Sequence, residues 1–338
     1  MYKNIVAGMI LSCVVLFPLA SLGAAEAKSC QLKRYASIDL TVVKGSYLLV
    51  PVTIQGTRAY MVLNMGSAFS NVTESAVITL ALKTKPVPDS VAVRESGRQV
   101  KKLATVTSFL LGGLQFRSAD FLVIPNESFS STLADAPIVG FLGMDVFGQV
   151  DIELDAAHRK MNLFSPDHCA GHTVYWSGKY DSVPIRFGTL GEFYFPMELD
   201  GKKLETTLAT SRPMTILQTD ATRKLYNFDS HSPDIESDTD SAGRTTGHYR
   251  AMKLSGEGIE IINARISLVD PAPNTGCHLS SRSGAATYEG CFGIHPLSLG
   301  QNVIDKLHLY IATKEKMLYF TPANPAAEAA PTPPEPAH

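Results

Sequence analysis

The stretch VPVTIQG at residues 50–56, followed by MVLNMGSAFS at 61–70, decides how this sequence is read, because it occurs twice. The second copy is FPMELDG at 195–201, followed by TTLATSRPMT at 206–215. The two copies align at a constant offset of 145 residues without a gap. In each, apolar residues surround a glycine turn and lead to a run of small residues. This pattern predicts a strand, a tight turn, a second strand and a loop, and therefore a duplicated β structure.

Two further pairs of segments extend the duplication toward the end of each half. GFLGM at 140–144 resembles GCFGI at 290–294. DIELDAAHRKMNLFSP at 151–166 aligns with LHLYIATKEKMLYFTP at 307–322, and both read as a strand, a polar turn and a strand. The repeats predict one lobe over residues 36–166, a connection over 167–181 and a second lobe over 182–322.

The remaining pattern is mostly β, with short apolar runs broken by Gly, Pro, Asn or Asp. Helical signal is limited to residues 74–82 and 219–225, which follow the two central loops at equivalent places. Thr73 and Thr219 are the predicted N-caps of these helices. Residues 323–338 are rich in Ala, Pro and Glu and predict a disordered tail.

The N-terminus predicts export. Lys3 precedes an apolar segment from Ile5 to Leu19, and small residues end in Ala-Glu-Ala at 25–27, which is typical of a signal peptide over residues 1–27. Residues 10–13, ILSC, are an alternative lipoprotein cleavage site that would lipidate Cys13. No other segment approaches the ~20 apolar residues of a spanning helix. We therefore expect a periplasmic or secreted protein without a membrane span once the signal is removed.

Composition and cysteine count narrow the function classes. Hydrophobic residues make up 45 % and charged residues 18 %, with a formal net charge of −2, so nothing favours nucleic-acid binding. After removal of the signal, Cys30, Cys169, Cys277 and Cys291 remain, an even number that predicts two disulfides in an exported chain. Their spacing favours Cys277–Cys291 and Cys30–Cys169, with buried free thiols as the alternative. Because no zinc-type spacing of Cys or His occurs, no metal or cofactor is expected.

At these motifs the chain resembles the exported bacterial retropepsin-like aspartic proteases with two tandem lobes, of the pepsin and retropepsin clan. The resemblance covers most of residues 36–322 and is most specific in VPV-x-x-x-G at 50–56, LGMDV at 142–146, D-x-ELD at 151–155, LFSPDHC at 163–169, LHLYIA at 307–312 and LYFTP at 318–322. It implies two β-barrel lobes that form a pepsin-like pseudo-dimer with a central cleft. Each lobe of such proteases gives one Asp to a shared dyad, and a hairpin flap closes over the substrate. Residues 243–250 and 94–102 are candidate flap tips, with an ordinary polar hairpin as the alternative for 243–250.

Both catalytic aspartates that the resemblance implies are replaced, by Asn64 and Ala209. A dyad works because two close carboxylates share one proton, so that one member activates water and the other donates to the substrate carbonyl. An amide is not a usable base near neutral pH, and alanine has no polar group. The neighbouring acids Asp145, Asp200, Glu205 and Asp220 are read as solvated or capping residues, because Glu205 lies roughly 13 Å back along its strand and Asp220 fits a first helical turn.

The loops around the lost acids differ in how much they keep of the family pattern. The residue after each Asp is normally Thr or Ser, whose hydroxyl ties the two loops together; Thr210 can supply this group, and Met65 cannot. Gly66 is retained, whereas Ser211 stands where close backbone approach favours glycine. The cleft-loop residues expected from the resemblance are Met65, Gly66, Ser67, Thr210, Ser211 and Arg212. His231, His248 and His278 are expected at the surface, and Tyr175 and Trp176 are expected to pack.

Three functions agree with this pattern. The first is a catalytically inactive pseudoprotease that binds extended polypeptide in its cleft by strand addition. The second is an active aspartic endopeptidase whose dyad lies elsewhere in the sequence. The third is a structural envelope protein whose cleft is filled by Met65, Arg212 and Met214. Since the duplicated lobes form a pair within one chain, an oligomer is not required.

Overall fold

A computed structural model describes residues 31–323, apart from 44–46, 89–90, 93, 96–97, 117, 127–135, 189–190, 234, 240–242, 244, 257, 271–278, 283–284 and 290–294. The chain is mostly β, as the sequence pattern predicts. The predicted signal peptide and all but the first residue of the predicted tail lie outside the described residues. In the part that is described, no helix is long and apolar enough to cross a membrane.

Strands of the first half form one sheet in the order β12-β11-β3-β4-β14-β5-β13-β10-β6, with β2 paired to β3. Their bounds are β2 Thr41–Val43, β3 Tyr47–Ile54, β4 Thr57–Leu63, β5 Asn71–Thr73, β6 Lys83–Pro86, β10 Lys102–Val106, β11 Phe109–Leu111, β12 Leu114–Phe116, β13 Ala119–Ile124 and β14 Ile138–Leu142. Two short helices accompany it, α1 (Glu74–Thr79) and α2 (Met144–Phe147). The Thr73 hydroxyl accepts the Ala76 N–H, as expected for an N-cap.

Strands of the second half form a sheet in the order β18-β19-β20-β27-β21-β24-β23-β22, with an additional β19–β23 pairing. Their bounds are β18 Arg186–Phe187, β19 Phe193–Leu199, β20 Lys202–Leu208, β21 Ile216–Gln218, β22 Glu236–Thr239, β23 Thr245–Gly256, β24 Ile259–Val269 and β27 Leu297–Leu299. Its helices are α3 (Thr219–Leu225) and α4 (Gln301–Ile304). Here the N-cap prediction was wrong: Thr219 is the first helical residue, and its hydroxyl donates to Asp270.

The two sheets share one pairing scheme around their central loops. In the first half, β14 runs parallel to β4 and antiparallel to β5, and β5 runs parallel to β13. In the second half, β27 runs parallel to β20 and antiparallel to β21, and β21 runs parallel to β24. The counterpart of residues 140–144 is therefore the segment from β27 into α4, and the predicted match to 290–294 was wrong. The predicted match followed the shared GxxG spacing of Gly140 and Gly143 with Gly290 and Gly293. The equivalent glycines before the helices are Gly143 and Gly300.

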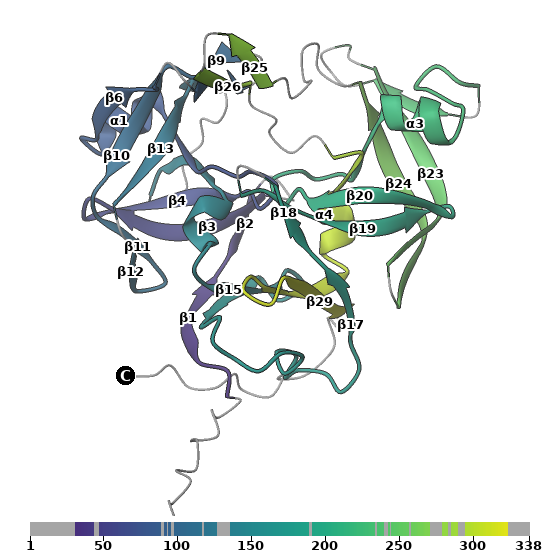
Figure 1. Cartoon of the computed structure of the whole chain (residues 1–338), viewed down its shortest axis with the longest axis horizontal. Coiled ribbons are helices and arrows are strands. Elements are labelled where there is room, and N and C mark those ends of the chain that lie inside the picture. Colours follow the sequence, from purple (N-terminus) through teal and green to yellow (C-terminus); the bar gives the residue numbers. More distant parts are fainter. Residues whose placement is uncertain are drawn as a thin grey trace, which may run out of the picture.

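A third sheet contains strands of both halves and is symmetric about its centre. Its order is β1-β16-β15-β28-β29-β17, with β1 Arg34–Asp39, β15 Asp151–Asp155, β16 Lys160–Phe164, β17 Asp181–Pro184, β28 Leu307–Ala312 and β29 Met317–Pro322. At the middle, β15 and β28 pair antiparallel with Ile152 opposite Ile311 and Leu154 opposite Leu309. Figure 1 shows the two halves side by side above this shared sheet. The two hairpins β15–β16 and β28–β29 confirm that these segments are equivalent. Their registers, with Asp155 opposite Lys160 and Ala312 opposite Met317, shift the predicted alignment of 151–166 with 307–322 by one residue.

Small strands lie at the opposite end of the molecule from the shared sheet (Figure 1). β8 (Arg94–Glu95) and β9 (Arg98–Gln99) form a hairpin at the first predicted flap position. At the second position, β22 and β23 also form a hairpin, although residues 245–250 belong to the strand and not to its tip. β25 (Leu279–Arg282) and β26 (Ala285–Glu289) of the second half form a sheet with β7 (Val91–Ala92) of the first.

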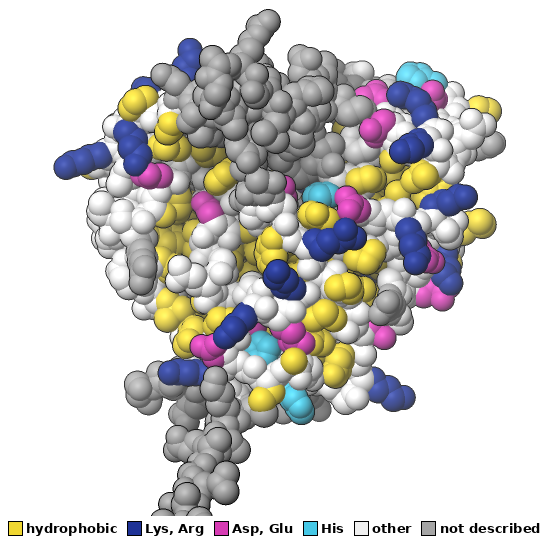
Figure 2. Space-filling view, in the orientation of Figure 1, with side chains coloured by type: hydrophobic (Ala, Val, Ile, Leu, Met, Phe, Trp, Pro, Cys, Tyr) yellow, Lys and Arg dark blue, Asp and Glu magenta, His cyan; other side chains and the backbone are white. Residues whose placement is uncertain are grey.

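One hydrophobic core runs through both halves and their shared sheet, and a second cluster lies on the other face of that sheet. The second cluster combines Phe164, Tyr310 and Tyr319 with Tyr175 and Trp176 of the connection. The predicted packing role of Tyr175 and Trp176 is thus confirmed. On the face that Figure 2 shows, acidic and basic side chains are interspersed, which agrees with the small net charge.

Candidate functional site

Two equivalent loops, residues 64–70 and 209–215, meet at the centre of the molecule. Each begins where a central strand ends: the Asn64 N–H donates to the Leu142 carbonyl at 2.9 Å, and the Ala209 N–H donates to the Leu299 carbonyl at 2.7 Å. Each then turns back on itself. The Ser67 N–H donates to the Asn64 carbonyl at 3.1 Å, and the Arg212 N–H donates to the Ala209 carbonyl at 2.9 Å.

Both loops end on a polar residue that is fixed by the helix that follows the neighbouring strand. In the first half, Asp145 of α2 accepts the Ser70 N–H at 2.9 Å and the Ser70 hydroxyl at 2.6 Å. In the second half, Asn302 of α4 accepts the Thr215 N–H at 2.7 Å and the Thr215 hydroxyl at 2.9 Å. Desolvation of its carboxyl group raises the pKa of Asp145, and the hydrogen bonds from Ser70 oppose that rise.

Close backbone approach explains the glycines that precede α2 and α4. A Cβ on Gly143 would lie 2.5 Å from the Phe69 carbonyl carbon, and a Cβ on Gly300 would lie 2.2 Å from the Met214 carbonyl carbon. The Gly143 N–H donates to the Ser70 hydroxyl and the Gly300 N–H to the Thr215 hydroxyl. Each half therefore holds its loop by the same set of contacts.

The two loops are joined to each other through Thr210. Its buried hydroxyl accepts the Met65 N–H at 2.9 Å and donates to the Leu63 carbonyl at 2.8 Å. The tie that the sequence assigned to Thr210 is confirmed in these two bonds. Only one half supplies it, because Met65 has no hydroxyl and its side chain is buried in the hydrophobic core.

At the positions where the resemblance implies aspartates, the structure places one amide and one methyl group. Asn64 is half-buried, and its Oδ1 accepts the Ser211 hydroxyl of the opposite loop at 3.0 Å. Ala209 is buried. Gly66 packs against the second loop so closely that a Cβ there would lie 2.7 Å from the Leu208 carbonyl oxygen. The loops are in contact, but neither carries a carboxylate.

The four acids near these motifs in sequence are engaged elsewhere. Asp145 holds Ser70 as described above. Asp200 lies in the β19–β20 turn with φ +47 and accepts the Lys253 N–H at 2.7 Å. Glu205 lies 3.9 Å from Arg186 with about half of its side chain exposed, and Asp220 is in the first turn of α3. The exposure of Glu205 and the first-turn positions of Asp145 and Asp220 agree with the solvated and capping roles predicted for them. The prediction for Asp200 was wrong, because it is half-buried and accepts hydrogen bonds from Lys253 and Tyr249.

Solvent reaches this site unevenly. Met65, Ser67 and Thr210 are buried, Gly66 and Ser211 are half-buried, and Arg212 is exposed. Among the histidines, His231 is exposed as predicted, whereas the prediction for His248 was wrong, since it is only 7 % exposed. His248 packs in the β23–β24 hairpin, where its Nδ1 lies 3.3 Å from the Ser267 hydroxyl. His278 lies outside the described residues.

A second polar cluster, which the sequence did not predict, lies on the shared sheet where the connection covers it. Asp151 Oδ2 is hydrogen-bonded to His168 Nε2 at 2.6 Å, and Glu153 Oε1 is hydrogen-bonded to His308 Nε2 at 2.8 Å. All four side chains are at most about a tenth exposed. Burial raises the pKa of Asp151. The only sequence signal is the alternation of acids in strand 151–155, which places them on one face.

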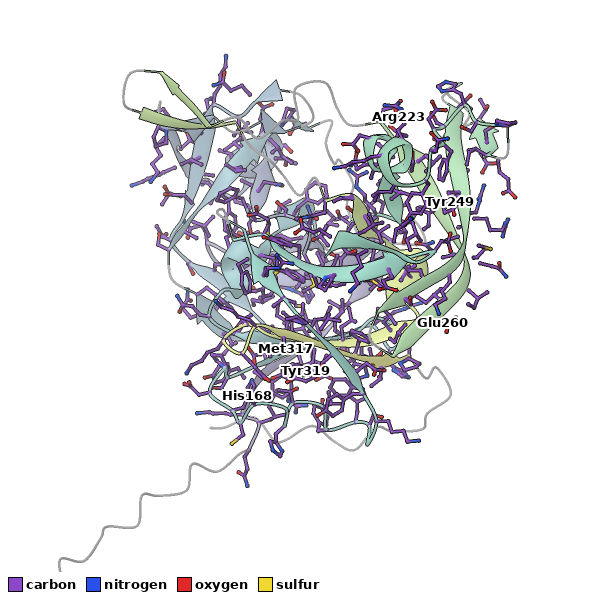
Figure 3. All side chains as sticks on the ribbon, turned by 45° about the vertical axis from the view of Figure 1, so that its right-hand side comes forward. His168, Arg223, Tyr249, Glu260, Met317 and Tyr319 are labelled. Carbon is purple, nitrogen blue, oxygen red and sulfur yellow. The ribbon has the colours of Figure 1, made fainter. Side chains whose placement is uncertain are left out.

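The connection contributes aromatic groups to this cluster. The Tyr175 hydroxyl donates to Glu153 at 2.7 Å, and the Trp176 ring stacks on His308 with centroids 3.8 Å apart. Figure 3 places His168, Met317 and Tyr319 together at the shared sheet, away from Tyr249 and Arg223 of the second half. Burial raises the pKa of Tyr175 and of Tyr310, so both stay neutral hydrogen-bond donors. This cluster fastens the connection and faces away from the paired loops.

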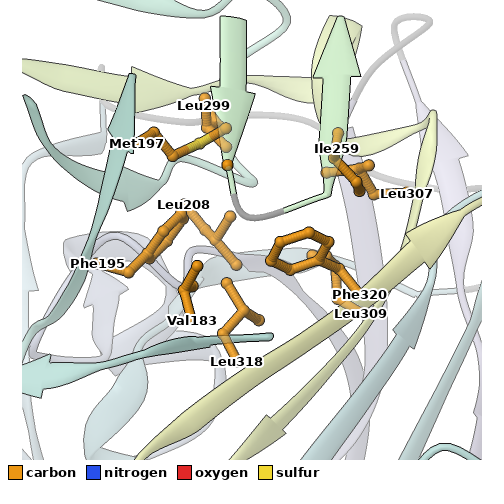
Figure 4. A pocket seen from close by; sticks show the side chains of 11 residues that line it. Val183, Phe195, Met197, Leu208, Ile259, Leu299, Leu307, Leu309, Leu318 and Phe320 are labelled. Carbon is orange, nitrogen blue, oxygen red and sulfur yellow. The ribbon is translucent and has the colours of Figure 1, made fainter. Parts of the chain in front are cut away.

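Between the second-half sheet and the shared sheet lies an apolar cavity (Figure 4). Its volume is about 20 Å³, which is near the size of one water molecule. Eleven residues line it, and none presents a polar side chain: Val183, Phe195, Met197, Leu208, Gly256, Ile259, Leu299, Leu307, Leu309, Leu318 and Phe320. A dry space of this size is a packing gap and not a ligand site.

No group of three or more His, Cys, Asp or Glu side chains that could hold a metal ion occurs within the described ranges. Cys169 takes part in a disulfide bond. Cys30, Cys277 and Cys291 lie outside the described residues, so the predicted pairings stay predictions. No protein-family model matches this chain, and no curated protein sequence matches it.

Proposed function

We propose that this chain is a retropepsin-like pseudoprotease of the cell envelope, which binds an extended polypeptide between two lobes without cleaving it. The observation that carries the proposal is the state of the paired loops. They keep the contacts that would hold a dyad in place, from the Thr210 tie to the matched Asp145 and Asn302 anchors. The groups that would do the chemistry are Asn64 and Ala209.

The chemistry of these two side chains supports binding without hydrolysis. Activation of water needs a base, and the side-chain oxygen Oδ1 of Asn64 already accepts the Ser211 hydroxyl. The Ala209 methyl group can neither take nor give a proton. The acids nearest in sequence are held by other partners, so none of them stands in for the dyad.

The arrangement of the halves supports the finer proposal of a pseudo-dimer with a central cleft. Both halves repeat one strand order, and the shared sheet is symmetric about the β15–β28 pair. Two loops that meet on such an axis provide a floor on which an extended chain can lie. Backbone hydrogen bonds to neighbouring strands would then give affinity with little dependence on side chains.

The test is a binding measurement on the mature chain, with fluorescently labelled pools of extended peptides followed by polarisation and mass spectrometry. We expect saturable binding and recovery of every peptide intact. Ser211→Trp should abolish binding by blocking the loops, while Thr57→Trp, in the exposed β3–β4 turn region, should not. Circular dichroism of both variants checks that they remain folded.

Absence of binding to any pool would contradict the proposal and favour a structural envelope protein. Recovery of cut peptides would favour an active endopeptidase. Binding that Ser211→Trp leaves unchanged would place the polypeptide elsewhere on the molecule.

A further inference from the structure

The charge at the paired loops is inverted relative to a catalytic dyad. Across residues 61–70 and 206–215 the single charged residue is Arg212. A dyad that shares one proton carries a negative charge and repels a carboxylate. Here the negative groups are gone, and the second loop carries a guanidinium instead.

Arg212 differs from the arginines around it in lacking an acidic partner. Four other arginines of the second half pair with acids: Arg186 with Glu205, Arg223 with Asp270, Arg250 with Glu236 and Arg265 with Asp238. The Arg212 side chain is exposed, and among the described residues no carboxylate or other acceptor is bonded to its guanidinium. Its fork of donors is therefore available to a ligand.

Asn64, on the opposite loop, offers further donors. Its Oδ1 accepts the Ser211 hydroxyl at 3.0 Å, so the remaining part of the amide is the NH₂ group. Asn64 is half-buried, so this donor group is partly accessible. Arg212 directly follows Ser211 in the chain, so its side chain begins one residue from this hydrogen bond.

Resting on the proposed function, we propose that the paired loops recognise a carboxylate of the bound polypeptide, with Arg212 as the charged donor and the Asn64 amide as a neutral one. Planar guanidinium groups bind carboxylates through two parallel hydrogen bonds, which gives direction as well as strength. The same chemistry is offered by an Asp or Glu side chain and by a C-terminal carboxylate. The site that would cut a peptide in a protease thus selects an acidic one here.

Three fluorescent peptides of one extended sequence test this by polarisation. One has a central Glu and an amidated C-terminus, one has Gln in its place, and one has Gln with a free C-terminal carboxylate. We expect the parent chain to bind at least one carboxylate peptide about tenfold more tightly than the amidated Gln peptide. Which carboxylate peptide binds more tightly identifies the source of the carboxylate.

Variants then assign the preference to the loops. Arg212→Gln should bring the peptides to near-equal affinity, and Asn64→Asp should weaken the carboxylate peptides most, by repulsion. Arg223→Gln removes the same charge from an exposed arginine on α3 and should leave the preference unchanged. It is the matched control for net charge.

Equal binding of all three peptides by the parent chain would overturn this inference and leave the proposed function standing. A preference that survives Arg212→Gln would also overturn it. Failure to bind any of the three, when other peptide pools bind, would contradict the inference alone, whereas failure with every pool would contradict the proposed function as well.

Discussion

At the scale of single residues, the Thr210 hydroxyl is the group on which contact between the two loops depends. It is buried, and it both accepts from the Met65 N–H and donates to the Leu63 carbonyl. Thr210→Val keeps the shape and leaves two buried backbone groups without a partner. We expect a loss of about 2–4 kcal/mol in the free energy of unfolding, measured by urea denaturation.

Thr210→Ser is the matched control, because it keeps the hydroxyl and should lose much less. If Thr210→Val proved as stable as Thr210→Ser, the hydrogen bonds would not be what joins the loops.

Asp145 gives a prediction for pH dependence. Desolvation of its carboxyl group raises the pKa of Asp145 in the folded chain above the unfolded value. Between these two pKa values the folded state therefore holds a proton that the unfolded state has released. The contribution of Asp145 to stability is therefore fully present below the unfolded pKa and is lost as the pH rises through the folded pKa. Asp145→Asn, which copies the residue at the equivalent position 302, should remove this decline.

Urea denaturation of the parent and of Asp145→Asn at a series of pH values measures this effect. The parent should lose stability relative to the variant as the pH rises. A constant difference between the two proteins across the series would show that Asp145 does not titrate differently on folding.

At the scale of elements, the β23–β24 hairpin borders the apolar cavity at Gly256. A Cβ on Gly256 would meet the Phe320 ring at 3.5 Å and the Met197 methyl at 3.8 Å, which are ordinary contacts. Gly256→Ala should therefore fill part of the cavity and also restrict the unfolded chain. We expect a gain of about 1 kcal/mol in the free energy of unfolding.

Thermal and urea denaturation check this gain against Gly178→Ala, in the connection, where no atom lies within 4 Å of an added Cβ. That control should show the unfolded-chain effect without the packing effect. A destabilised Gly256→Ala variant would mean that the hairpin cannot accept a side chain there.

The elements also show how far the sequence predicts this fold. The first strands and loops of each half were predictable, because the repeat from 50–70 to 195–215 runs without a gap. The strand before α4 was not, because Leu297–Leu299 is short and the glycine pattern at 290–294 resembles its counterpart more closely. The predicted match relied on the glycine spacing at 290–294. In the structure, the counterpart of β14 is β27, because β27 is the strand that pairs parallel to β20.

At the candidate site, the absence of a carboxylate at positions 64 and 209 and the Thr210 tie were predictable, because single residue types carry that chemistry. The burial of Met65 and of His248 could not be predicted, because the direction of a side chain depends on the strand and loop geometry around it. Nor was the cluster of Asp151 and Glu153 with His168 and His308. Its members lie up to 157 residues apart and meet only because β15 and β28 pair.

At the scale of the whole molecule, the two halves are held as a pair by the shared sheet and the connection beneath it. Glu153 at the centre of that sheet accepts hydrogen bonds from Asn162, Tyr175 and His308. Glu153→Ala would leave these three donors without their partner, and Asn162 and His308 among them are buried. We expect a loss of at least about 3 kcal/mol, followed by the fluorescence of Trp176, the single tryptophan, which stacks on His308.

Asp39→Asn is the control, because Asp39 is 83 % exposed and its pair with Lys160 is a surface ion pair that should contribute little. If Glu153→Ala unfolded no more easily than Asp39→Asn, the cluster would not be what fastens the halves together.

We propose that the molecule has kept the architecture of a peptide-binding protease and lost its chemistry. The most direct test is a peptidase assay of the mature chain on a diverse peptide library from about pH 3 to 8, with cleavage detected by mass spectrometry. The double variant Asn64→Asp, Ala209→Asp, assayed in parallel, shows whether the two acids alone were missing. We predict that the parent chain cuts no peptide at any pH. Cleavage by the parent chain that pepstatin inhibits would contradict the claim and show that a working dyad exists elsewhere in the chain.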